Sequence, residues 1–278
     1  MAAGPAVTAR GVARPRRRPL RLYGSLAPLP YLTIATSLFL LMFVGWWVAA
    51  RVHLASSFFL PSPGQVWHRA EQLARDGTLW QDTKVSFIRI SVGWLISTAV
   101  GVPVGILIGT LRPLEAALEP PIDFIRYMPA VAFVPLTIVW VGVGETQKYL
   151  IIFIGTFFQQ ALMVMDNVKR VPHEYVDIGR TLGMRESTIL ARIVIPAAAP
   201  ALWDTLRITI GWAWTWLVVA ELVAANNGLG HRIITAQRFF ETDTIFVGIL
   251  TIGLLGLIMD QAMKFSGARL FHWAEKRR

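Results

Sequence analysis

The residues of this 278-residue chain that could do chemistry are charged side chains set inside long apolar segments. Asp123 and Arg126 stand three residues apart, Asp204 and Arg207 repeat that spacing, and Glu221 stands alone. Side chains three apart share one face of a helix, so each Asp can pair with its Arg. Charges at membrane depth mark substrate or ion pathways by default. We therefore take these five residues as pathway candidates.

Each of these charges also has a structural alternative. Asp123 and Arg126 could form an ion pair near the inner face that serves the fold alone. Glu221 lies near the outer end of its segment, just before the turn NNGLG (226–230). Its carboxylate could cap backbone N–H groups of that turn, and we favour this role slightly over a place on the pathway.

The segment around the first pair is rich in proline. Residues 114–141 contain Pro120, Pro121, Pro129 and Pro135, more than an ordinary packed helix tolerates. Irregular backbone at membrane depth occurs only where it is buried in protein or lines a cavity. This broken segment, with Pro129 and Pro135, is therefore the predicted lining of a pathway.

Several kinds of enzyme site are missing from the sequence. There is no cysteine, and the five His residues are scattered, so neither a disulfide nor a metal site is expected. There is no G-x-x-x-x-G-K-[ST] phosphate loop, no G-x-S-x-G and no H-E-x-x-H. The sequence predicts no catalytic residue and no cofactor bound by this chain; energy from ATP would need a partner.

The composition is that of a membrane protein with several spans. Hydrophobic residues make up 54% and charged residues only 16%, against about 25% charged in soluble domains. We predict an all-α protein with six transmembrane helices and both termini cytoplasmic. The predicted spans are about 31–50, 85–111, 114–141, 148–166, 201–224 and 244–263.

The charges orient these spans. Most of the 27 Lys and Arg residues fall in segments that a six-span topology places on one side, which is the cytoplasmic side by the positive-inside rule. The net charge of +10 therefore indicates a lipid bilayer and no nucleic acid. The predicted organisation is a disordered basic cytoplasmic tail (1–30), a first transmembrane helix (31–50), an external segment with an amphipathic helix (51–81), a core (82–264) and a cytoplasmic tail (265–278).

Glycines recur every four residues in the second span. Gly101, Gly105 and Gly109 share one helical face, and small residues at this spacing let two helices approach closely in lipid. We interpret them as packing residues.

One long polar stretch, residues 172–200, interrupts the apolar second half. Pro172 can open a short helix, and Gly183 can close it in the left-handed conformation. A second short helix follows, and Pro196 is expected to break it. The prediction is a helix–turn–helix elbow within a loop spanning 167–200, and the charge bias places it in the cytoplasm.

This elbow resembles the EAA coupling loop of ABC-importer permeases. Asp177-Ile178-Gly179 stands where that family has Glu-Ala-Ala, Gly183 matches its fixed glycine, and Ile193-Val194-Ile195-Pro196 matches its closing I-x-L-P. The sequence departs from the motif in having Asp for Glu and Ile-Gly for Ala-Ala. The resemblance implies that Asp177, Gly179, Gly183, Ile193 and Pro196 are the coupling residues.

Other segments extend the resemblance to the taurine, sulfonate, nitrate and bicarbonate branch over roughly residues 59–265. They are FLPSPGQVW (59–67), LWQDTKVSFIRISVGW (79–94), GVPVGILIG (101–109), PAVAFVPLTIVWVGVGE (129–145) and VVAELVAANNGLG (218–230). The resemblance implies a permease in a prokaryotic inner membrane that imports a small anion or sulfonate. Its implied partners are a second copy, two cytoplasmic ATPase subunits that bind ATP and Mg, and an external solute-binding protein.

Two other functional classes remain open from the residues alone. A self-sufficient ion-coupled secondary transporter is the main alternative, although such proteins usually show internal repeats with paired broken helices, and only one heavily broken span is evident. A membrane enzyme is a weaker third possibility.

Overall fold

The computed structural model describes residues 28–274, and these form helices and connecting turns without strands. The chain divides into two units, one up to Ala49 and one from Ala50 onward. Helix α1 (Pro28–Arg51) makes up, as far as Ala49, the described part of the first unit. Its apolar side chains are mostly exposed, as expected for a helix whose surroundings are lipid. Most of the predicted tail 1–30 lies outside the described residues.

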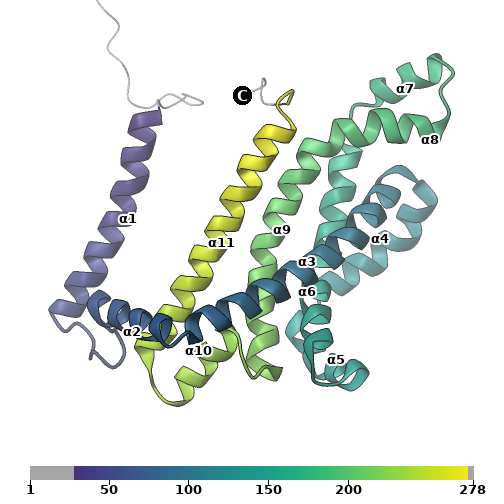
Figure 1. The fold of residues 1–278 in the computed structure, drawn as a ribbon. Coiled ribbons are helices and arrows are strands. Elements are labelled where there is room, and N and C mark those ends of the chain that lie inside the picture. Colours follow the sequence, from purple (N-terminus) through teal and green to yellow (C-terminus); the bar gives the residue numbers. More distant parts are fainter. Residues whose placement is uncertain (1–27, 275–278) are drawn as a thin grey trace, which may run out of the picture. The chain divides into compact units, whose positions relative to one another are not determined.

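The second unit is a bundle of long helices with short helices at both ends. In Figure 1, α7 and α8 lie at one end of the bundle, and α5 and α10 lie at the other. The elements are α2 (Pro63–Arg75), α3 (Thr78–Thr110), α4 (Arg112–Arg126), the 3-10 turn η1 (Ala130–Phe133), α5 (Val134–Val141), α6 (Glu145–Lys169), α7 (His173–Thr181), α8 (Glu186–Ile189), the π-helical segment η2 (Leu190–Val194), α9 (Ile195–Ala224), α10 (Leu229–Arg238) and α11 (Thr242–Leu270).

The number of possible membrane spans agrees with the prediction. Five stretches of helix among the described residues are long and apolar enough to cross a membrane. A sixth is formed if α4 and the η1–α5 segment, which bend by 92° at their junction, count as one broken span. The predicted all-helical, multi-span fold is therefore confirmed.

The two long helices α3 and α6 approach closely along a row of small residues. A Cβ atom added to Gly105 would lie 2.5 Å from the carbonyl oxygen of Ala161, and one added to Gly109 would lie 3.0 Å from that of Met165. Gly101 packs against Phe157 and Gln160. The same row continues toward the start of α3 at Ser97, which donates a hydrogen bond to Gln160 (2.8 Å), and at Gly93. The three predicted glycines thus all face α6.

The broken span differs from the prediction in where it breaks. Pro120 and Pro121 lie inside α4 and do not interrupt it. Proline's fixed φ of about −65° is itself helical, so α4 loses two backbone donors but keeps its course. The break falls at residues 127–129, which end with Pro129, and Pro135 lies in the first turn of α5.

Pro196 also behaves differently from the prediction, because it does not break the second elbow helix. α8, η2 and α9 follow one another without a gap, and Pro196 sits in the first turn of α9. The π-helical turn explains this: the N–H of Ile195 bonds to the carbonyl of Leu190, five residues back. Such a widened turn accommodates a proline ring that would collide with the carbonyl four residues back.

The α3–α6 contact makes a stability prediction. Gly105→Ala should lower the unfolding free energy by about 1–3 kcal/mol, since even one methyl group overpacks this contact. Gly253→Ala on α11 is the matched control, because a Cβ there meets no atom within 4 Å. Thermal unfolding of the purified protein measures both variants. Equal melting temperatures for the two would contradict the close packing at Gly105.

Candidate functional site

The elbow is closed by the glycine that the sequence indicates. Gly183 has φ +72°, its N–H bonds to the carbonyl of Arg180 (2.9 Å), and the N–H of Met184 bonds to that of Gly179 (3.0 Å). These two bonds are those of a Schellman motif. The first helix, α7, begins one residue after Pro172.

Gly179 lies where the two arms of the elbow, α7 and the α8–η2 stretch, pack against each other. It is buried, and a Cβ at this position would lie 3.0 Å from side-chain atoms of both Ile189 and Ile193. Two of the predicted coupling residues, Gly179 and Ile193, are therefore in contact inside the elbow. Arg180 and Glu186 clamp the turn from outside by a hydrogen bond of 2.8 Å, which raises the pKa of Arg180 above its ordinary value.

The outer face of α7 is apolar and uncovered. Tyr175, Ile178 and Leu182 recur at the i, i+3, i+7 spacing of one helical face, and each is exposed, Leu182 at 74%. Asp177, the predicted docking carboxylate, lies beside them and is also exposed. Our sequence analysis did not single out Tyr175, Ile178 and Leu182 as one face, although their helical spacing within a charged segment was the available signal.

A cavity of about 450 Å³ opens where the broken span meets α6 and α9. Arg126 lines it at the end of α4, and Phe133 lines it from η1. Its other walls include Phe158 and Gln159, near the middle of α6, and Trp212, Thr215 and Trp216 of α9. The break at residues 127–129 therefore leaves room at mid-depth of the bundle.

Of the two predicted ion pairs, one forms in the structure and the other does not. Asp123 and Arg126 pair at 2.9 Å as expected. Arg207, however, does not form its ion pair with Asp204: its guanidinium binds Asp260 of α11 through two bonds of 2.6 and 2.8 Å. A helix packed alongside offers a carboxylate in bidentate geometry, which a neighbour at i−3 does not. Asp204, Arg207 and Glu221 are not among the residues that line the cavity beside Arg126.

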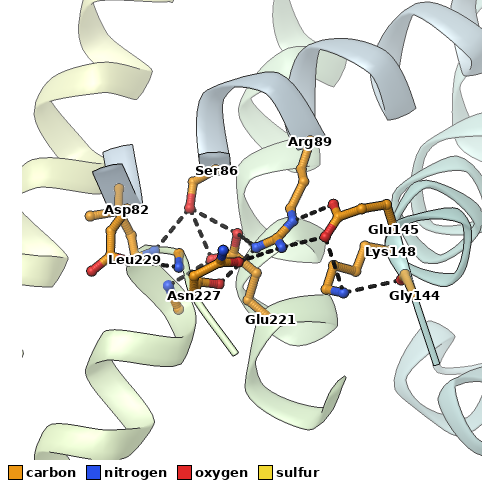
Figure 2. A network of polar contacts seen from close by, with 11 residues as sticks. Asp82, Ser86, Arg89, Gly144, Glu145, Lys148, Glu221, Asn227 and Leu229 are labelled. Carbon is orange, nitrogen blue, oxygen red and sulfur yellow. Dashed lines mark hydrogen bonds and ion pairs between the residues drawn. The ribbon is translucent and has the colours of Figure 1, made fainter. Parts of the chain in front are cut away.

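Glu221 instead belongs to a buried polar network that joins three long helices (Figure 2). Its side chain is fully buried, and its carboxylate accepts hydrogen bonds from Ser86 (2.8 Å), Arg89 (2.9 Å) and the N–H of Gly230 (2.8 Å). The last contact is the backbone cap of the NNGLG turn that we favoured for this residue. Gly228 leaves space for the carboxylate, because a Cβ there would lie 2.4 Å from it.

Arg89, which is 2% exposed, is the centre of this network. Its guanidinium pairs with Glu145 at the start of α6 (2.6 Å) and with Glu221 on α9 (2.9 Å), and it donates to the backbone and side-chain oxygens of Asn227. Asp82 of α3 completes the cap of α10 by accepting from the N–H of Gly228 (2.8 Å). Sequence analysis missed Arg89, since a single Arg in a predicted span does not reveal its partners.

Among residues 28–274, no group of three His, Asp or Glu side chains lies close enough together to hold a metal ion. The arrangement offers an exposed helix at one end, a cavity at mid-depth, and a buried cluster of paired charges at the end opposite the elbow.

Comparison with known proteins decides the family. Residues 101–272 match the family model described as the binding-protein-dependent transport system inner membrane component. The chain belongs to this family. It is therefore a multi-pass inner-membrane permease subunit of the ABC-importer class, and the alternative of an independent secondary transporter is set aside.

Its relatives include permeases named for taurine, aliphatic sulfonate and bicarbonate transport. It is 36% identical to a probable ABC transporter permease protein of Brucella abortus, over 84% of this chain and 92% of the relative. It is 34% identical to the taurine transport system permease protein TauC of Escherichia coli, over 82% of this chain and 85% of the relative. The inward-facing MetNI methionine ABC transporter has a chain of the same fold, with a TM-score of 0.60, 22% identity, and coverage of 69% of this chain and 94% of that one.

The buried network of the permease predicts a large effect of a single change. Arg89→Met should cost about 3–5 kcal/mol of stability, since it leaves the Glu221 carboxylate buried without its cation. Arg75→Met is the control: Arg75 pairs with Glu71 on the exposed face of α2, where such a pair contributes about 0–1 kcal/mol. Thermal unfolding in detergent measures both. A melting temperature of the Arg89 variant equal to that of the control would show that the network does not hold the helices together.

Proposed function

We propose that this permease works as a homodimer with two cytoplasmic ATPase subunits and an external solute-binding protein, and that it imports a small anion or sulfonate. The observation that carries the proposal is the uncovered apolar face of α7. In a polar segment, exposing Tyr175, Ile178 and Leu182 together to water is unfavourable, and such a patch is typical of a surface that another protein covers.

In this proposal α7 is the coupling helix. Its apolar residues enter a groove of the ATPase, and Asp177 forms a polar contact at the rim. ATP and Mg bind to the ATPase partner, and this chain takes no part in bond chemistry. The family name, which specifies binding-protein-dependent transport, supports the external partner.

The elbow is built to transmit motion. Gly179 packs α7 directly on Ile189 and Ile193, so the docking helix and the second arm move together. The second arm is continuous with α9 through the π-helical turn. A movement of α7 would therefore be transmitted along an unbroken helix to Trp212 and Trp216 in the cavity. In this way the ATPase would change the packing of the spans around that cavity.

The cavity beside Arg126 is the proposed part of the pathway. It combines a cationic side chain with broken backbone, the combination expected where a span lines a passage. Pro129 and Pro135 would maintain the break. Relatives named for the transport of taurine, aliphatic sulfonates and bicarbonate support an anion as the substrate.

The closing glycine of the elbow provides a test of coupling. Gly183→Val should leave the protein inserted but uncouple ATP hydrolysis from uptake, because a β-branched residue is strained at φ +72° and the docking helix would shift. Gly142→Val is the matched control, since Gly142 also has a positive φ (+75°) and open space around it, in the turn between α5 and α6. The measurement is ATP-driven uptake alongside ATPase activity in proteoliposomes. Normal coupled uptake by the Gly183 variant would remove the coupling claim.

The apolar face of α7 provides a second test. Leu182→Ser should weaken capture of the ATPase by the tagged permease by at least about tenfold, as expected for an interface anchor. Phe239→Ser is the control: Phe239 is 72% exposed, against 74% for Leu182, but follows α10 at the opposite end of the bundle. Pull-down from membranes with quantitative mass spectrometry measures both. Equal recovery of the ATPase by the two variants would exclude α7 as the docking surface.

A further inference from the structure

The lining of the mid-depth cavity indicates more than a general preference for anions. Each of its polar side chains carries a hydrogen-bond donor: Arg126, Trp212 and Trp216 carry donors alone, and Gln159 and Thr215 carry an acceptor oxygen as well. No Asp or Glu is among the described residues that line it. An anionic group with several acceptor oxygens matches these donors and the positive charge of Arg126.

The remaining walls of the cavity are aromatic. Four rings line it, those of Phe133, Phe158, Trp212 and Trp216. Trp216 is held in place because its ring lies against the backbone at Gly155, where an added Cβ would be 2.3 Å away. The volume of about 450 Å³ is within the range of about 300–1,000 Å³ for sites that enclose whole organic ligands. This volume is larger than a bare oxyanion would fill.

Asp123 reduces the charge of this site without entering it. Its carboxylate holds Nε of Arg126 at 2.9 Å, and one terminal nitrogen of the guanidinium donates to the Tyr127 hydroxyl at 3.2 Å. The other donors of the guanidinium remain for a ligand. A partly neutralised cation binds an anion weakly enough to release it, as a transport site requires.

We propose that this cavity binds an oxyanion carried on a ring-sized apolar body, namely an arylsulfonate or a similar aromatic acid. The sulfonate oxygens accept from Arg126 and neighbouring donors, and the ring packs between the aromatic side chains. This inference rests on the proposed role of the cavity as part of the import pathway, and it names the substrate class.

The test is equilibrium binding to the full-length permease with its ATPase in nanodiscs, measured by calorimetry without ATP and without the solute-binding protein. Benzenesulfonate should bind at least about tenfold tighter than methanesulfonate, which lacks the ring, and than benzenesulfonamide, which lacks the charge. Equal binding of benzenesulfonate and methanesulfonate would overturn the proposed substrate class.

Four variants separate the cavity from general effects. Arg126→Gln should weaken benzenesulfonate binding about tenfold, and Trp212→Ala should abolish the preference over methanesulfonate. Asp123→Asn should strengthen binding, because it frees the guanidinium, whereas a merely structural ion pair predicts no gain. Glu71→Gln, at the local ion pair with Arg75 on α2, is the control and should leave binding unchanged. Unchanged binding by Arg126→Gln, in a variant that elutes like the wild type, would overturn the proposal.

The binding assay also separates this inference from the proposed function. If Leu182→Ser retains its ATPase while benzenesulfonate binds as expected, the coupling proposal fails and the cavity proposal stands. If coupling is confirmed but benzenesulfonate does not bind, only the substrate class is wrong.

Discussion

The buried ion pairs of Arg89 hold the long helices of this protein in their positions. The buried guanidinium of Arg89 bonds to Glu145 of α6, Glu221 of α9 and Asn227 ahead of α10, so a single side chain of α3 holds three other parts of the chain at the end opposite the elbow. A charge enclosed in a membrane protein is stable only when it is paired and hydrogen-bonded. This requirement fixes the helices relative to one another more sharply than apolar contacts do, because in lipid the hydrophobic effect does not favour one helix pairing over another.

The opposite end of the bundle is built on a different principle. The elbow keeps its internal contacts, Gly179 against Ile189 and Ile193 and the turn at Gly183, but its outer face on α7 is left uncovered. Between the two ends lies the cavity beside Arg126. α9 connects all three: it continues from the elbow, carries Trp212 and Trp216, and carries Glu221 in its last turn. In the proposed mechanism, a helix anchored at one end and moved by the ATPase at the other would let the packing around the cavity alternate between two states.

The two corrections to the sequence analysis concern proline and ion pairing. Proline at 120, 121 and 196 was expected to break helices, yet α4 and the α8–η2–α9 stretch run through these positions. Proline's φ is compatible with a helix, and a π-helical turn relieves the collision that its ring causes. Arg207 was expected to pair within its own helix and pairs with Asp260 of α11 instead, because sequence spacing reports only local neighbours. The second correction matters for the site, since Arg207 pairs with α11 and lies outside the cavity that Arg126 lines.

The helical membrane fold, the glycine row of α3, the closing glycine of the elbow and the broken span can all be predicted from the sequence. Each depends on composition, periodicity or the conformational range of one residue. The sequence also indicated the cap that Glu221 provides, since the turn follows it closely. The partners of Arg89 and Arg207, the position of the cavity and the uncovered face of α7 became visible only in the folded chain. These features depend on which helices lie side by side, and residues 56 and 132 positions away from Arg89 leave no local pattern that could reveal the pairing.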